Sequence, residues 1–407
     1  MLLEIALMFA IGMALGVLAG LVPGLHPNTL LVIAVAVFLS SAPPNGTYGM
    51  IALVVSMSVS NAIVNFIPSI FLGAPDPDSC LSILPGHRML MEGRGNEALF
   101  LTIVGSVGAL ALTAVSLPLM VVLLPVIYEA MHAYMLPLLV ALTASLLLQE
   151  RMKARSLLMF IASGAAGFML LSAIPSDQAL FPAFSGLFGA SLMLGSLMKK
   201  ASLPPQGHKA MMKCSWAKGT LAGWAAGLLV GIMPGIGSAQ AGVLASRALK
   251  GDRRDFLVAL GGISISNIIF TFIALHTIGK TRSGAAWALS EAVGSITMGE
   301  LCFIMFIAAL SCFASSIISL KVGKVFLGMA VKLDYGRMNL GVLVMITALV
   351  GLITGMTGLL VMALCSVMGL CCEAIGVKKM YLMGFLMLPT MLYFAGLSPY
   401  ALLLLGL

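Results

Sequence analysis

Long apolar stretches fill most of the chain, and two of them are interrupted by the same short break. The first reads GVLAGLVPGLHPNTLL from Gly16, and the second reads GLLVGIMPGIGSAQAG from Gly227. A Pro-Gly pair ends a helix because Pro lacks the N–H donor and Gly readily leaves the helical conformation. Backbone groups freed inside a bilayer are tolerated only where protein buries them or where they line a wet cavity. The two breaks therefore predict the floor of a binding site.

The residues around the two breaks match position by position, and the match extends along both halves of the chain. At the breaks, Gly16, Gly20, Pro23 and Gly24 align without a gap with Gly227, Gly231, Pro234 and Gly235. Further on, Ser60-Asn61 matches Ser266-Asn267, Phe66-Ile67 matches Phe272-Ile273, Gly73 matches Gly279, and GNEALF from Gly95 matches MGELCF from Met298. We interpret the chain as an internal duplication.

The first half, residues 1–198, is predicted to hold a broken hairpin followed by membrane crossings. Residues 1–40 form the hairpin, since the loop after them is uncharged and suits a return better than a crossing. Apolar stretches predict crossings within residues 48–198, near 48–72, 98–128, 131–149, 156–174 and 182–198, with a long polar connection over 73–97. A basic linker, residues 199–218, follows.

The second half, residues 219–407, repeats this plan. Residues 219–249 form the second broken hairpin, and crossings are predicted within 256–396, one to about 279 and four near 297–320, 338–355, 357–374 and 379–396. Each half holds a hairpin, which returns to the side where it started, and five crossings. Because the number of crossings is odd, the second repeat is inverted relative to the first. We therefore predict an all-α integral membrane protein of two inverted repeats, each with a re-entrant helical hairpin and about five transmembrane helices.

Composition supports the membrane assignment and adds an orientation. Of the 407 residues 60% are hydrophobic and 9% are charged, and the mean hydropathy is +1.11, which a soluble domain of this length does not reach. The net charge of +8 comes from Lys and Arg in short loops, so it indicates orientation and no nucleic-acid partner. The basic loop Arg151 to Arg155 and the linker 199–218 are predicted to be cytoplasmic. Lys280 and Arg282 are predicted to lie on the extracytoplasmic side, which is against the preference of basic loops for the cytoplasm.

At the breaks the chain resembles the TctA family, the large permease subunit of the tripartite tricarboxylate transporters. That family carries a duplicated Pro-Gly-(Leu/Ile)-Gly break, present here as Pro23-Gly24-Leu25-His26 and as Pro234-Gly235-Ile236-Gly237. It also carries an Asn-Ala element followed by Ile-Pro and Leu-Gly-x-Pro, which Asn61-Ala62, Ile67-Pro68 and Leu72-Gly73-Ala74-Pro75 match. His26 replaces a Gly of the family pattern, and Ser266-Asn267-Ile268 is not followed by an equivalent Pro.

The resemblance implies a secondary active transporter in the cytoplasmic membrane of a prokaryote. Its substrates would be small organic anions of the di- or tricarboxylate type, with Na⁺ or H⁺ as the coupling ion and no other cofactor. The implied partners are the lipid bilayer, a small membrane subunit and an extracytoplasmic solute-binding protein, and a homodimer is left open. The chain is not expected to be an enzyme.

The half-helices that start after the breaks predict where an anion binds. Their free N–H groups and positive dipole ends would face the cavity near the middle of the membrane. The predicted substrate-binding residues are Gly24, His26, Asn28, Thr29, Gly235, Gly237, Ser238 and Gln240. For His26, a role as a capped polar group at the cavity wall is an equal alternative.

Polar residues in the crossings that follow the breaks are candidates for the substrate or the coupling ion. These are Ser60, Asn61, Asn65, Ser266 and Asn267, with bonding between helices as the alternative role. Further candidates are Asp76, Asp78 and His276. The alternative for the two aspartates is a solvent-facing loop, and the alternative for His276 is a position at the membrane interface. The residues Gly16, Gly20, Pro23, Gly227, Gly231 and Pro234 are expected to shape the hairpins, because small residues at this spacing allow close helix packing.

Two other classes of function remain open from the residues alone. A translocase of a polyprenyl or lipid phosphate would use the same inverted hairpins, but it would have Lys or Arg beside the breaks, and neither break contains one. An intramembrane enzyme would need a nucleophile with a base or a metal cluster, and neither HExxH nor GxSxG occurs. The seven Cys have no metal-ligand spacing, so packing is their expected role and Na⁺ is the only expected metal.

Overall fold

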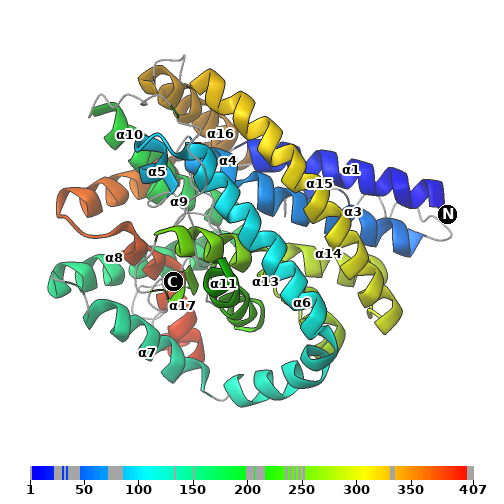
Figure 1. The fold of residues 1–407 in the computed structure, drawn as a ribbon. Helices are drawn as coiled ribbons and strands as arrows, with labels where there is room; N and C mark the ends of the chain where they lie inside the picture. Colours follow the sequence, from blue (N-terminus) through cyan, green and yellow to red (C-terminus); the bar gives the residue numbers. More distant parts are fainter. Residues whose placement is uncertain are drawn as a thin grey trace. The chain divides into compact units, whose positions relative to one another are not determined.

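The structure is a computed structural model of the 407-residue chain, and every secondary-structure element in its described part is a helix (Figure 1). The described residues are 2–22, 30, 31, 34, 46–71, 86–132, 134–148, 150, 152–198, 206, 216–233, 237, 238, 241, 242, 244, 245, 249, 253–330 and 335–400. The helices are α1 (Leu2–Leu21), α3 (Gly46–Val64), α4 (Phe66–Phe71), α5 (Arg88–Met91), α6 (Gly95–His132), α7 (Met135–Leu148), α8 (Lys153–Ala173), α9 (Ser176–Phe184), η2 (Ser185–Ala190), α10 (Ser191–Met198), α11 (Trp216–Ile232), α13 (Arg253–Ile278), α14 (Gly284–Val293), α15 (Met298–Ala330), α16 (Tyr335–Ala374), η3 (Lys379–Met383) and α17 (Gly384–Phe394).

The predicted all-α membrane protein is confirmed at this level. Among the described residues, seven helices are long and apolar enough to cross a membrane. They are Leu2–Leu21, Gly46–Phe71, Gly95–Met131, Lys153–Ala173, Arg253–Ile278, Met298–Gly328 and Leu343–Ala374. The two crossings predicted at 338–355 and 357–374 correspond to α16, whose backbone leaves the helical conformation at Gly355 with a φ of 68°.

The described residues gather into two compact units, and each unit draws on both halves of the sequence. Unit 1 comprises residues 1–126, 202–232 and 237–338, and unit 2 consists mainly of 127–201 and 339–407. The units are therefore a different division of the chain from the predicted repeats 1–198 and 219–407, which remain a prediction. Each unit is described separately below.

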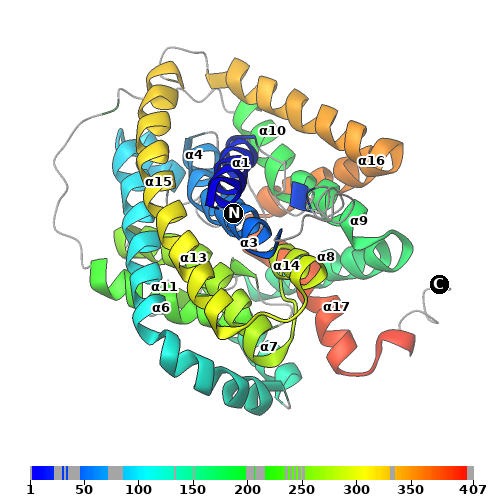
Figure 2. The same cartoon turned by 90° about the vertical axis from the view of Figure 1, so that its right-hand side faces the viewer.

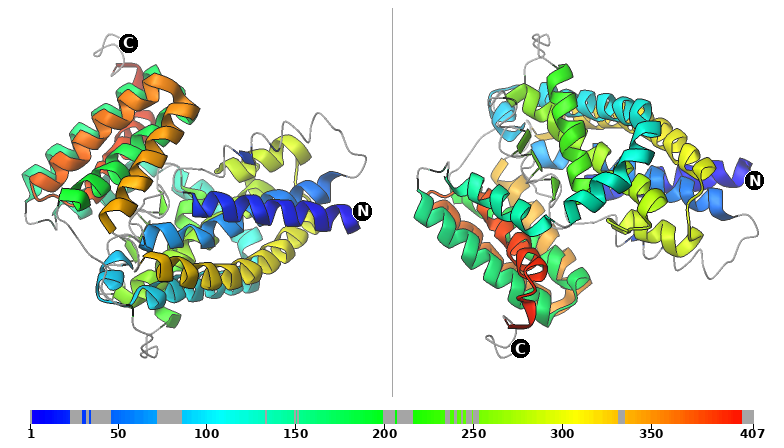
Figure 3. Two further views of the ribbon diagram at one scale, coloured as in Figure 1. Left: turned by 90° about the horizontal axis from the view of Figure 1, so that it is seen from above. Right: turned by 90° about the horizontal axis from the view of Figure 1, so that it is seen from below.

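In unit 1, the first helix of each half packs closely on the next long helix of the same half (Figures 2 and 3). A Cβ added at Gly12 or Gly16 of α1 would overlap the backbone carbonyl oxygen of Leu53 or Met57 in α3. Further along, a Cβ at Gly20 would lie 3.0 Å from Cβ of Val64. Because positions 12, 16 and 20 meet successively later positions of α3, the two helices run parallel.

The pair α11 and α13 repeats this arrangement. A Cβ added at Gly223 would lie 2.5 Å from the carbonyl oxygen of Ala259, and one at Gly231 would lie 2.7 Å from Cβ of Phe270. A Cβ at Gly227 would overlap Cβ of Ser266. These glycines align with those of α1, so the duplicated sequence produces the same parallel helix pair twice.

The long helix that follows in each half packs on the helix pair of the other half. In α6, a Cβ at Gly105 would overlap the carbonyl oxygen of Val258 in α13. In turn, a Cβ at Gly261 of α13 would overlap the carbonyl oxygen of Thr102. The hydroxyl of Ser106 donates a hydrogen bond to the carbonyl oxygen of Gly261 at 3.1 Å. The equivalent helix α15 packs on α3. Unit 1 therefore contains two places where a helix of one half packs across a helix of the other half.

Contacts between helix ends fix the directions of the helices in unit 1. The rings of Tyr48 and Phe303 meet at 5.1 Å, so α3 and α15 begin together. The rings of Phe71 and Phe326 stack at 6.0 Å, so the segment α3–α4 and the helix α15 also end together. We call the end where α3 begins the α3 end of unit 1.

The opposite end of unit 1, which we call the α13 end, is where α6 and α13 begin. A Cβ at Gly323, near the end of α15, would overlap the side chain of Leu99 in the second turn of α6. Arg254, in the first turn of α13, forms an ion pair of 3.0 Å with Glu97 in the first turn of α6. The equivalent helices α3 and α13 therefore begin at opposite ends of unit 1.

Unit 2 shows the same exchange between halves (Figure 3). A Cβ at Gly167 of α8 would overlap the carbonyl oxygen of Phe385 in α17, and one at Gly384 would overlap that of Phe160 in α8. Between α16 and η2, a Cβ at Gly186 would overlap the carbonyl oxygen of Met362, and one at Gly369 would overlap that of Leu187. In each contact one helix comes from the first half and its partner from the second.

Candidate functional site

Part of the predicted site falls on residues that the structure describes. These are Gly16, Gly20, Ser60, Asn61, Asn65, Gly227, Gly231, Gly237, Ser238, Ser266, Asn267 and His276. Outside the described residues lie Pro23, Gly24, His26, Asn28, Thr29, Asp76, Asp78, Pro234, Gly235 and Gln240, as do all of the linker 199–218 except 206 and 216–218. The roles predicted for all of these residues remain predictions.

The two equivalent asparagines lie beside the last turn of each helix that leads into a break. A Cβ added at Gly20 would lie 3.2 Å from the carbonyl oxygen of Asn61, and one at Gly231 would lie 3.3 Å from that of Asn267. The helix α1 ends at Leu21 and α11 ends at Ile232. The duplicated sequence therefore brings each asparagine to the level where its neighbouring helix stops.

The backbone carbonyls of both asparagines are occupied by bonds within their own helix segments. The carbonyl oxygen of Asn61 accepts a hydrogen bond of 2.9 Å from the N–H of Asn65. That of Asn267 accepts one of 2.7 Å from the hydroxyl of Thr271. Asn61 is buried, with 7% of its surface exposed, and Asn267 is half-buried. The side-chain amides of the two residues take no part in these bonds.

The two equivalent serines next to these asparagines differ in their bonding. The hydroxyl of Ser60 donates to the carbonyl oxygen of Ser56 at 2.7 Å. The hydroxyl of Ser266 is fully buried and has no hydrogen-bond partner among the described residues. A buried hydroxyl without a partner is unusual in native proteins and requires an explanation.

A helix restarts directly after the second break. The N–H of Ala241 donates to the carbonyl oxygen of Gly237 at 3.2 Å, which is the spacing of an α-helical bond. Ser238, at the start of this helical stretch, is 2% exposed. The described part of this segment therefore places a buried serine at the start of a helix, where the helix dipole is positive.

His276 lies at the α3 end of unit 1, close to the C-terminus of α13. Its Nδ1 lies 2.6 Å from the carbonyl oxygen of Ile296, so the ring nitrogen carries a proton and donates it to this oxygen. This bond joins the end of α13 to the segment that precedes α15. It gives His276 a structural function where one helix ends and the next begins.

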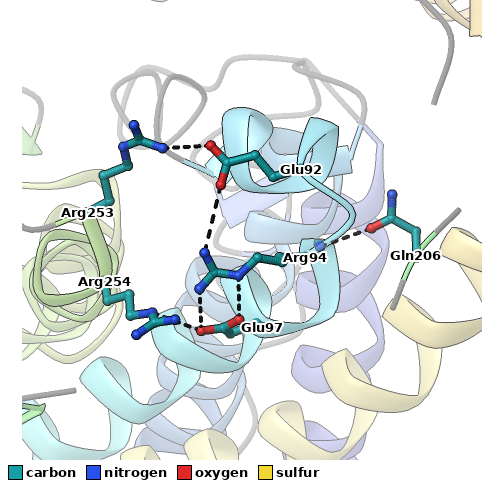
Figure 4. A network of polar contacts seen from close by, with 7 residues as sticks. Glu92, Arg94, Glu97, Gln206, Arg253 and Arg254 are labelled. Carbon is teal, nitrogen blue, oxygen red and sulfur yellow. Dashed lines mark hydrogen bonds and ion pairs between the residues drawn. The ribbon is translucent and has the colours of Figure 1, made fainter. Parts of the chain in front are cut away.

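At the α13 end, a polar network joins the two halves of the chain (Figure 4). Arg94 donates two hydrogen bonds of 2.8 Å to the carboxylate of Glu97. These hydrogen bonds raise the pKa of Arg94 above its ordinary value. From α13, Arg254 reaches Glu97 at 3.0 Å and Arg253 reaches Glu92 at 2.8 Å.

The linker between the halves is attached to the same network. The side-chain oxygen of Gln206 accepts a hydrogen bond of 3.0 Å from the N–H of Gly95, and its amide nitrogen donates to the carbonyl oxygen of Leu90 at 3.0 Å. In the sequence, Glu97 is recognisable only as an acidic residue directly before the crossing predicted at 98–128. The three-residue spacing from Arg94 to Glu97 is visible in the sequence, but the pairing with Arg254 depends on the tertiary fold.

The two ends of unit 1 differ in charge. Among the described residues, the α13 end carries the basic residues Arg88, Arg94, Lys218, Arg253, Arg254, Lys321 and Lys324 and the acidic residues Glu92, Glu97 and Asp255. The α3 end carries the basic residues Lys280 and Arg282 and the acidic residues Glu4, Glu291 and Glu300. The α13 end is therefore the more basic of the two.

A family model and one curated protein match most of the chain. The model of the tripartite tricarboxylate transporter TctA family matches residues 6–384. An uncharacterized protein of Methanocaldococcus jannaschii is 27% identical over 290 residues, which cover 70% of this chain and 72% of that protein. No solved structure matches the chain.

Proposed function

Because the chain belongs to the tripartite tricarboxylate transporter TctA family, we propose that it is a secondary active transporter of small organic anions of the di- or tricarboxylate type. The family match, which covers residues 6–384, gives the chain a transport role as a component of a tripartite system. The observation that carries the finer proposal is the repeated geometry of Gly20 with Asn61 and of Gly231 with Asn267 at the helix ends before the two breaks.

We propose that the two halves are inverted repeats with re-entrant hairpins. The opposite starting ends of α3 and α13, and of α6 and α15, support the inversion. The parallel run of α1 and α3 supports the first hairpin, since the chain has to return to its starting side between residues 22 and 46. The same reasoning applies to α11 and α13 between residues 233 and 253. Transporters of this kind bind their substrate where the two repeats meet.

The substrate would bind at the helix starts after the breaks. The positive dipole end at a helix start, together with the hydroxyl of Ser238, suits a carboxylate. A coupling Na⁺ would be held by oxygens of Asn61, Asn65, Ser266 and Asn267, whereas the hydroxyl of Ser60 already donates to the carbonyl oxygen of Ser56. A coupling H⁺ would need a titratable group such as His26. Alternating access would expose this site to each side in turn. The alternative substrate is a polyprenyl or lipid phosphate, which the same helix starts could bind.

The proposed setting is the cytoplasmic membrane of a prokaryote, with the α13 end in the cytoplasm. The difference in charge between the two ends of unit 1 supports this orientation. The proposed partners follow from the family, whose members act with a small membrane subunit and an extracytoplasmic solute-binding protein. A substrate delivered by such a protein would arrive at the α3 end.

Thermal unfolding of the purified protein tests the substrate class. Citrate or a dicarboxylate, added with Na⁺, should raise Tm, because a ligand that binds only the folded state stabilises it. The variants Asn61→Ala and Asn267→Ala should fold with similar yield and lose this rise. A rise with inorganic phosphate or a polyprenyl phosphate alone would replace the carboxylate proposal by the translocase, and no rise with any anion would contradict both.

A further inference from the structure

We infer that unit 1 moves as one rigid body during transport, so that the two sequence halves do not rock against each other. This inference rests on the proposed transport function and concerns which parts of the chain stay together. It follows from the contacts that join the halves within unit 1. If it is correct, the helices that lead into the two breaks travel together.

The crossing of α6 and α13 leaves no room for sliding. The backbones touch at Gly105 and Gly261, where even a methyl group would overlap the carbonyl oxygen of the opposite helix. The hydrogen bond from Ser106 to the carbonyl oxygen of Gly261 lies at the same crossing. Packed interfaces of this density switch between discrete arrangements and do not deform gradually. A motion of one half against the other would have to break this contact completely.

A second contact ties α6 to α11, the helix that leads into the second break. A Cβ at Gly108 would lie 2.8 Å from Cγ2 and 3.5 Å from Cβ of Thr220. At the equivalent crossing, the hydroxyl of Ser315 in α15 lies 3.8 Å from the sulfur of Met13 in α1. The helix before each break is therefore held by a long helix of the opposite half.

The contact of α6 with α13 and the contact of α15 with α3 are each stabilised further at one helix end, by an ion pair in the first and by aromatic rings in the second. At the α13 end, the carboxylate of Glu97 is 10% exposed and pairs with two arginines, one from each half. At the α3 end, the edge-to-face contact of Tyr48 and Phe303 occupies the equivalent position. Separating the halves would expose a nearly buried carboxylate at one end and an aromatic pair at the other.

A disulfide across the halves tests the inference directly. The pair Gly108→Cys and Thr220→Cys would join α6 to α11, since the 3.5 Å between their Cβ positions falls in the range of disulfides. The seven native cysteines are replaced by alanine, and a protease site inserted in the linker 199–218 reports the bond on a non-reducing gel. Oxidised protein in liposomes should take up citrate within about twofold of the reduced protein, as expected where transport needs no motion at this contact.

Uptake that falls to background on oxidation and returns with a reductant would overturn the inference. The matched control is Met8→Cys with Gly49→Cys, which joins α1 to α3 within one half, where Cγ of Met8 lies 3.4 Å from the Cβ position of Gly49. This bond is compatible with both kinds of motion and should leave uptake intact. Absence of uptake in the reduced protein would contradict citrate transport by the chain without its proposed partners, and not the rigid unit.

A distance measurement decides the question without uptake. Spin labels on Val107→Cys in α6 and Leu221→Cys in α11 occupy exposed positions on the two halves. If unit 1 is one rigid body, the distance between the two labels should have a single distribution that does not change with Na⁺, citrate or both. A second distance, or a shift on adding citrate with Na⁺, would show that the halves move against each other.

Discussion

Among single residues, Ser60 and Ser266 illustrate how a duplicated sequence can diverge in function. Both lie beneath a glycine of the neighbouring helix, but only Ser60 has a hydrogen-bond partner among the described residues. A hydroxyl that loses its water and gains no partner costs about 1–3 kcal/mol. The second serine is therefore the better candidate for contact with a ligand or ion, and the first for packing.

Alanine substitutions should separate the two roles. Ser60→Ala removes a buried hydrogen bond and should lower the free energy of unfolding by about 1 kcal/mol, with uptake largely kept. Ser266→Ala removes an unpartnered hydroxyl, so stability should stay equal or rise while uptake or its Na⁺ dependence falls. Unfolding in detergent and uptake in liposomes measure the two effects. Equal losses of stability in both variants would assign both serines to packing.

The sequence is informative about residues whose function depends on local spacing. Gly16, Gly20 and their equivalents are recognisable because close packing requires small residues four apart. The ion pair of Glu97 with Arg254 cannot be read from local spacing, because Arg254 lies in the other half and only the tertiary fold brings the two residues together. The unequal bonding of Ser60 and Ser266 was equally inaccessible, because it depends on side-chain conformation and not on residue type.

Among elements, the glycine faces of α1 and α11 determine how closely each helix pair packs. At Gly16 an added methyl group would overlap the carbonyl oxygen of Met57, a backbone atom that cannot rotate away. At Gly328 in α15, by contrast, an added Cβ would have no heavy atom within 4 Å. The same substitution should thus have opposite effects at the two sites.

Gly16→Ala and Gly227→Ala should each destabilise the protein by about 1–3 kcal/mol, because overpacking forces the helices apart. Gly328→Ala should stabilise it by about 0.4–1 kcal/mol, since Ala restricts the unfolded chain and fits an open helical position. Each variant is heated and then run on a size-exclusion column. The temperature at which its monodisperse peak disappears is compared among the three variants. Destabilisation by Gly328→Ala as large as that by Gly16→Ala would contradict the packing account.

The apolar pattern predicts long helices, but it does not show every feature within them or between them. The crossing predicted at 98–128 is part of one helix, α6, although it contains Pro118 and Pro125, because packing and membrane surroundings tolerate proline inside a helix. The helix α14 was not predicted. It is too short to cross a membrane and starts with a hydrogen bond from the N–H of Ala286 to the hydroxyl of Ser283, a local feature without a long apolar pattern.

On the scale of the whole molecule, the network around Glu97 joins the halves through charge. Glu97→Gln removes a nearly buried carboxylate between Arg94 and Arg254 and should lower the free energy of unfolding by about 1–3 kcal/mol. Glu92→Gln removes a carboxylate that is 41% exposed and should cost less than about 1 kcal/mol. Urea unfolding followed by tryptophan fluorescence compares the two variants. A larger effect for Glu92→Gln would show that the ion pair of Glu92 with Arg253, and not Glu97, contributes most to joining the halves.

The orientation of unit 1 can be measured in intact cells. In a cysteine-free background, Lys280→Cys at the α3 end should react with a maleimide that cannot cross the membrane. Arg253→Cys at the α13 end should react only after the cells are opened. Labelling of Arg253→Cys alone from outside would reverse the orientation of unit 1, and labelling of both from outside would contradict α13 as a membrane crossing.

The sequence indicates a duplication and a membrane protein, but it does not indicate the two compact units. A duplication shows which segments are equivalent and says nothing about which of them share a core. The units depend on contacts such as Gly105 with Val258 and Gly167 with Phe385, which are far apart in the chain. Each of these glycines resembles any other small residue in a membrane helix until its partner is known.

The backbone contact of Gly105 with Val258 also has a consequence for biosynthesis. About 150 residues separate the two positions, so at about 5–20 residues per second the ribosome needs about 8–30 s to supply the partner of α6. During this interval the bare glycine face of α6 has only lipid, the translocon or a chaperone to cover it. A chain that stops at the linker should therefore be degraded, whereas the two halves, produced together as separate polypeptides, should protect each other, which pulse-chase labelling would reveal.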